Sequence, residues 1–101
     1  MGDITRIKIN GLDWEVKIVP NSVIEGQTGS KNWGCTNNMS QTIYLDERMP
    51  NQLLERVLTH ELTHAILTSF SQSEETYTEE DICCLFEAHH HTIEKLLKEI
   101  F

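Results

Sequence analysis

The segment Leu58–Leu67, LTHELTHAIL, places the five residues HELTH inside a run that is otherwise mostly apolar. His60 and His64 are four residues apart, about one turn of an α-helix, so both imidazole rings leave the same helical face. Two histidines at this spacing can reach one metal ion, and zinc prefers nitrogen ligands of this kind. Glu61 stands about 100° around the helix from His60, where a general base takes a proton from water beside a metal. The segment therefore predicts a helix with His60 and His64 as Zn²⁺ ligands and Glu61 as the catalytic base.

A pair of buried histidines bonded to backbone carbonyls is the structural alternative to a metal site. Spacings of three and four residues along this helix, which is expected to begin near Pro50, predict one apolar stripe. Its members are Leu53, Val57, His60, His64 and Leu67. A buried polar group without a partner costs roughly 1–3 kcal/mol, and a metal would give both rings a partner. The pattern favours the metal.

A catalytic zinc needs a third protein ligand and one open position. Since residues 65–71 hold no histidine, the ligand is expected from a second helix that runs from about Thr78 to the C-terminus. The candidates are Glu79, Glu80, Glu87 and one of His89, His90 and His91. Thr76–Glu79 fits a capping box in which Glu79 bonds the N–H of the cap residue, which leaves Glu80 free and makes it the favoured ligand. Three consecutive helical histidines diverge by about 100° each and do not chelate one ion as a set.

The N-terminal half of the sequence predicts strands. Ile4–Val19 alternates apolar and polar residues around the turn Asn10-Gly11, and Leu12, Trp14, Val16 and Ile18 are expected on the inner face. Val23–Gly34 is expected to be a loop, and Trp33–Thr36 with Thr42–Leu45 a second hairpin. Strands followed by two helices give an α+β class with an N-terminal antiparallel sheet. In the second helix the inward face is expected to include Ile82, Leu85, Phe86, His89, Ile93, Leu96, Leu97 and Ile100.

Length, charge and cysteine content narrow the class of protein. The 101 residues suit one domain over 1–101, and a net charge of −8 argues against nucleic-acid binding because it repels phosphates. No stretch approaches the roughly 20 apolar residues that a membrane span needs, and residues 1–6 lack the apolar region of a signal peptide. Three cysteines, with Cys83 and Cys84 adjacent, form no disulfide framework and favour a cytoplasmic location.

Four parts of the sequence together resemble a known family. They are the N-terminal hairpin, GCTNNMSQTIYLDE, VLTHELTHAIL and EEDICCLFEAHHHTI. The combination is similar to the small zincin-like proteins of phages and prophages, which are related to the ImmA/IrrE-type metallo-endopeptidases. The resemblance implies a minimal zincin-like domain in which His60 and His64 bind zinc and Glu61 is the base. It also implies that a glutamate of the Glu79-Glu80 pair completes the site, and that the substrate is a protein, such as a regulator.

The sequence is therefore compatible with two alternative functions. The first is a zinc-dependent peptidase whose extended substrate pairs with an exposed strand, for which Thr42–Leu45 is the candidate. Tyr77 is a candidate for stabilising the transition state of this reaction. The second is a protein-binding module, such as a phage regulator or inhibitor, that a metal stabilises without catalysis. Metal content and peptide cleavage with and without a chelator distinguish the two.

Overall fold

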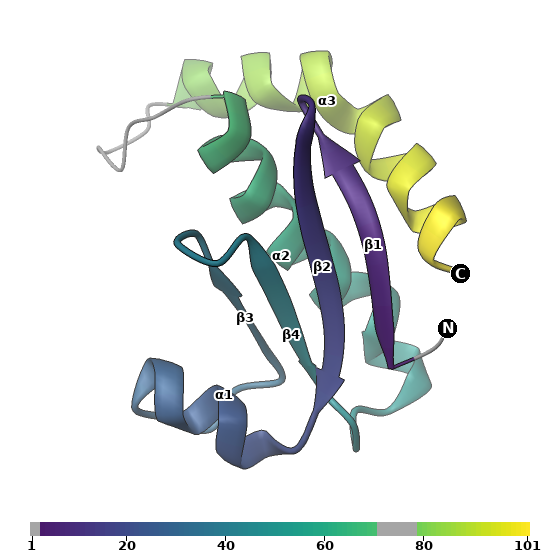
Figure 1. Ribbon diagram of the computed structural model, residues 1–101. Coiled ribbons are helices and arrows are strands. Elements are labelled where there is room, and N and C mark those ends of the chain that lie inside the picture. Colours follow the sequence, from purple (N-terminus) through teal and green to yellow (C-terminus); the bar gives the residue numbers. More distant parts are fainter. Residues whose placement is uncertain (1–2, 71–78) are drawn as a thin grey trace.

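The protein is an α+β fold, as the sequence predicts (Figure 1). The computed structural model describes residues 3–70 and 79–101, without the side chains of residues 70, 79–82, 84 and 87. In chain order, the elements are β1 (Ile4–Ile9), β2 (Leu12–Val19), α1 (Asn21–Thr28), β3 (Gly34–Asn37), β4 (Thr42–Asp46), α2 (Asn51–Phe70) and α3 (Glu79–Ile100). Both long helices begin close to the residues expected from the sequence.

The four strands form one sheet in the order β1-β2-β4-β3. The two expected hairpins are present, and at the tip of the first Asn10 and Gly11 have φ of 51° and 77°, values that these two residue types tolerate well. The pairing of β2 with β4 is parallel, so the sheet is mixed and not wholly antiparallel as expected. β4 lies inside the sheet, which corrects the expectation that Thr42–Leu45 is an exposed strand. The edges are β1 and β3.

The expected loop at Val23–Gly34 is wrong over its first part, because α1 occupies it. Pro20 opens the helix, and Gly29, at φ 77°, closes it with its N–H donated to the carbonyl of Glu25 at 2.8 Å. Ile24 is the one buried residue of this helix, so its sequence carries little periodic signal. The helix forms part of the crossover that parallel neighbours such as β2 and β4 require.

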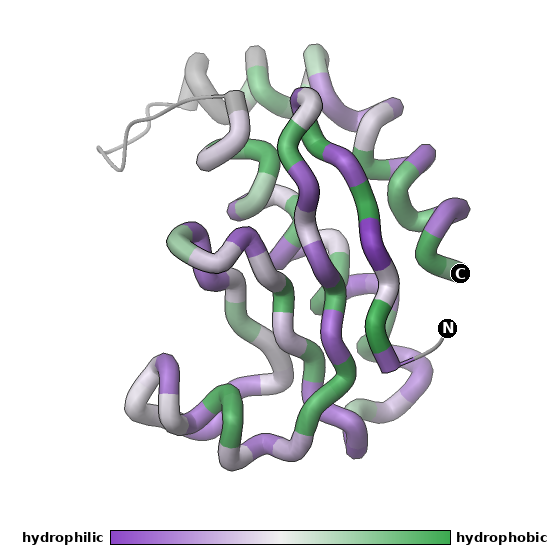
Figure 2. Tube along the Cα trace, in the orientation of Figure 1, coloured by the Kyte–Doolittle hydropathy of each residue, from purple (hydrophilic) through white to green (hydrophobic). Residues whose placement is uncertain are grey.

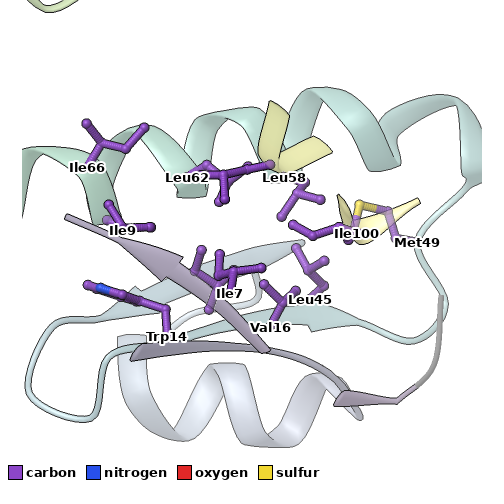
Figure 3. Packing of buried hydrophobic residues seen from close by; sticks show 13 residues of the cluster. Ile7, Ile9, Trp14, Val16, Leu45, Met49, Leu58, Leu62, Ile66 and Ile100 are labelled. Atoms are coloured by element: carbon purple, nitrogen blue, oxygen red, sulfur yellow. The ribbon is translucent and has the colours of Figure 1, made fainter. Parts of the chain in front are cut away.

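The core lies between the sheet and the two long helices (Figure 3). Its buried members are Ile7, Ile9, Trp14, Val16, Ile43, Leu45, Met49, Leu58, Leu62, Ala65, Ile66, Leu96 and Ile100. α1 lies against β3 and β4 on the other face of the sheet. Hydrophobic and hydrophilic residues alternate along the strands, as the tube in Figure 2 shows. Among the described residues of β2 and α3, Leu12 (42%) and Phe86 (68%) are exposed, although both were expected on an inner face. The side chain of Ile82, expected on the same face as Phe86, lies outside the described part.

Gly34 allows β3 to pack tightly against α2. A Cβ at this position would lie 3.0 Å from the carbonyl oxygen of Tyr44 and 3.2 Å from Cγ1 of Val57. We expect Gly34→Ala to lower the free energy of unfolding by about 1–3 kcal/mol, because backbone and core atoms must shift to make room. Gly26→Ala is the control, since a Cβ there meets nothing within 4 Å and alanine is preferred in a helix. Urea unfolding measures both, and an equally stable Gly34→Ala protein would contradict this packing.

Candidate metal centre

His60 and His64 point their Nε2 atoms at each other from consecutive turns of α2. The two nitrogens are 3.2 Å apart, and the ring planes meet at 70°. That distance suits a nitrogen-to-nitrogen hydrogen bond. It also suits two ligands of one ion, since nitrogens bound to a tetrahedral zinc at about 2.0–2.1 Å lie about 3.3–3.4 Å apart. The separation of the two nitrogens is therefore compatible with two ligands of one zinc ion.

The buried face of α2 is not the stripe that contains the histidines. Leu58, Leu62, Ala65 and Ile66 are fully buried, whereas both imidazole rings are exposed. The expected placement of His60 and His64 on a buried stripe is therefore wrong, and so is the alternative of a core pair bonded to backbone carbonyls. The rings instead line a cleft, where an ion can reach them from solvent.

Glu61 is the buried charged group of this helix, with 7% of its surface exposed. Its Oε1 accepts a hydrogen bond of 2.8 Å from Oγ1 of Thr36 on β3. Burial of a carboxylate is costly unless a donor compensates it, and this hydroxyl is such a donor. The result is a carboxylate held in place at the wall of the cleft that His60 and His64 also line.

The cleft lies between α2 and β3 and has a volume of about 720 Å³. Its lining comprises Asn32, Trp33, Gly34, Cys35, Thr36, Asn38, Leu53, Arg56, Val57, His60, Glu61 and His64. This volume lies within the range of about 300–1,000 Å³ typical of ligand sites. Trp33, 43% exposed, offers an apolar surface. Arg56 lies four residues before His60 and is the one lysine or arginine among the described lining residues.

The free edge of β3 runs along this cleft. In the β3–β4 hairpin the N–H of Asp46 donates to the carbonyl of Trp33 at 2.8 Å. Hydrogen-bonded and non-hydrogen-bonded pairs alternate in an antiparallel ladder. Gly34 and Thr36, opposite Leu45 and Ile43, therefore occupy non-hydrogen-bonded positions. Their N–H and C=O groups point away from β4, towards the open edge.

Cys35 lines the same cleft and is buried. Burial raises the pKa of its thiol, and the negative charge of Glu61 raises it further. A thiol with a raised pKa is a weaker nucleophile near neutral pH, because attack needs the thiolate.

The expected third ligand lies outside the described side chains. The backbones of Glu79, Glu80 and Glu87 belong to α3, which packs against α2, but their side chains, like Tyr77 and the capping box at residues 76–79, are not among the described parts. Among the side chains that are described, no third histidine, cysteine, aspartate or glutamate joins His60 and His64.

The three histidines of residues 89–91 lie on α3, and His89 is half-buried. His91 is exposed and lies 4.0 Å from Glu94, and the ring of His90 stacks on Phe86. Cys83 is exposed.

Thr36 and Arg56 are the site residues that the sequence interpretation missed. The four-residue spacing from Arg56 to His60 could have indicated that Arg56 lies at the site, because it places both residues on one helical face. No comparable signal existed for Thr36, since its contact with Glu61 joins elements 25 residues apart.

Neither a scan of protein families nor searches of curated proteins and of solved structures found a match. Within the described residues, no helix has the length and apolar character that crossing a bilayer requires.

Proposed function

We propose that the protein is a zinc-dependent peptidase. The observation that carries the proposal is the pair of Nε2 atoms of His60 and His64, 3.2 Å apart in a cleft whose wall holds the buried carboxylate of Glu61. Two imidazoles beside a carboxylate suit zinc better than magnesium or calcium, which prefer oxygen ligands. A cytoplasmic location and the kinship with phage-encoded zincin-like proteins belong to the same proposal.

Each of these cleft residues has a separate role in the proposed reaction. When bound, zinc would act as a Lewis acid that polarises the scissile carbonyl and favours ionisation of water near neutral pH. Glu61 takes a proton from the attacking water and passes it to the leaving amine as the C–N bond breaks. Arg56 gives the cleft a positive charge, which is the kind of group that stabilises developing negative charge on a carbonyl oxygen.

The substrate is proposed to be an extended segment of a protein or peptide, such as a regulator. Such a segment can add to the edge of β3 through the outward backbone groups of Gly34 and Thr36. This edge replaces the inner strand β4 that the sequence suggested. The exposed surface of Trp33 would then contact an apolar side chain of the substrate.

Cleavage of a diverse peptide pool tests the proposed function. We expect cleavage by the zinc-loaded protein, loss of cleavage with a chelator and recovery when zinc is added back. Peptides that bind in a zinc-dependent way but stay intact would instead favour the metal-stabilised binding module. A pool that is neither bound nor cut would contradict both functions.

Glu80 is proposed as the third ligand, and thermal unfolding with and without zinc tests it against its neighbours. A ligand that binds only the folded state raises its stability, so Glu80→Ala should remove the zinc-dependent gain in melting temperature. Glu79→Ala and Glu87→Ala should keep it, although Glu79→Ala costs about 0.5–2 kcal/mol at either zinc level through the lost cap. Loss of the gain in Glu79→Ala alone would assign the pair the other way. A gain that survives in all three variants would point to a histidine of residues 89–91, or to water.

A further inference from the structure

Thr36 is connected to two parts of the cleft at once. Its hydroxyl oxygen lies 2.8 Å from Oε1 of Glu61 and 3.2 Å from the carbonyl oxygen of the same residue. A hydroxyl has one proton to donate, and the carboxylate is the closer acceptor and the charged one. The side chain of Thr36 therefore fixes the orientation of the Glu61 carboxylate.

The backbone of Thr36 faces the other way. Because its pair with Ile43 is non-hydrogen-bonded, its N–H and C=O point to the open edge of β3. An extended peptide that adds to this edge would form hydrogen bonds with these two groups. One residue would thus contact a bound peptide through its backbone, and it contacts Glu61 through its side chain.

We propose that Thr36 is a positioning residue that sets the place of Glu61 relative to a peptide bound along β3. The inference rests on the proposed peptidase function and adds a residue to it. A β-branched side chain has a restricted χ1, so the hydroxyl of Thr36 is held stiffly by the strand. The register of the peptide and the direction of the carboxylate are then fixed by the same residue.

Three threonine variants separate this role from simple packing. Thr36→Val keeps the size of the side chain and removes the donor, whereas Thr36→Ser keeps the donor. Thr42→Val is the matched control, because Thr42 also lies in the sheet but its hydroxyl donates to the carbonyl of Ser40 and not to Glu61.

Steady-state cleavage of a peptide from the pool measures the effect on catalysis. We expect kcat of Thr36→Val to fall about 10- to 100-fold, the size of effect that misplacement of a reacting group causes. KM should stay within about threefold, since the backbone groups that bind the peptide are unchanged. Thr36→Ser should recover most of the loss in kcat, and Thr42→Val should show none of it.

A second measurement needs neither zinc nor cleavage. With ¹³C-labelled glutamate carboxyls, the Glu61 signal is identified by its disappearance in Glu61→Gln. We expect this signal to move in Thr36→Val and to return towards its original position in Thr36→Ser. A merely structural role of the threonine methyl group would not produce this pattern.

Each outcome decides between the two proposals. If the unaltered protein cleaves peptides and Thr36→Val retains its kcat, the positioning role is wrong and the peptidase stands. The same holds if Thr36→Ser loses as much kcat as Thr36→Val, or if the Glu61 signal does not move. If the unaltered protein cleaves nothing, the proposed function is wrong and the positioning role is wrong with it.

Discussion

Glu61→Gln is expected to lower kcat for peptide cleavage by about 10²- to 10⁴-fold, the contribution typical of a general base. The amide has nearly the same size, and its oxygen can still accept the hydrogen bond from Thr36, which is 2.8 Å from Oε1. It cannot take the proton of the attacking water. The bound zinc and the melting temperature should therefore change little while turnover is lost. Steady-state kinetics on zinc-loaded protein measures the effect.

Glu55→Gln provides the matched control for this substitution. Glu55 is an exposed glutamate on the same helix, outside the lining of the cleft, so the same change of charge there should leave kcat unaltered. Full activity in Glu61→Gln would mean that another group takes the proton. Loss of zinc as complete as in His60→Ala would make Glu61 a metal ligand and contradict its role as base.

The part of the fold that the sequence predicts best is the part with strong local signals. Asn10-Gly11 between alternating strands specifies a hairpin by itself, and Pro50 before a long apolar pattern marks the start of α2. The spacing of His60 and His64 likewise places both rings on one face, as observed. Each of these features depends on residues within a few positions of one another.

What the sequence does not predict depends on contacts between distant segments. α1 buries only Ile24, so no periodic pattern distinguishes it from a loop. No local sequence pattern indicates the parallel pairing of β2 with β4 either. Because of this pairing, β3 is the edge strand beside the cleft. The exposure of His60 and His64 is also a tertiary effect, because the spacing of a stripe does not say whether it faces the core or a cleft.

Zinc content of the purified protein, never exposed to chelator or acid, tests the central claim most directly. Elemental analysis should find about one zinc per chain, and almost none in His60→Ala or His64→Ala, because one imidazole cannot replace the pair. Glu55→Ala is the control, since Glu55 is exposed on the same helix and lies outside the lining of the cleft, so this variant should keep the zinc. Protein without any transition metal, or full zinc content after loss of either His60 or His64, would contradict the metal centre.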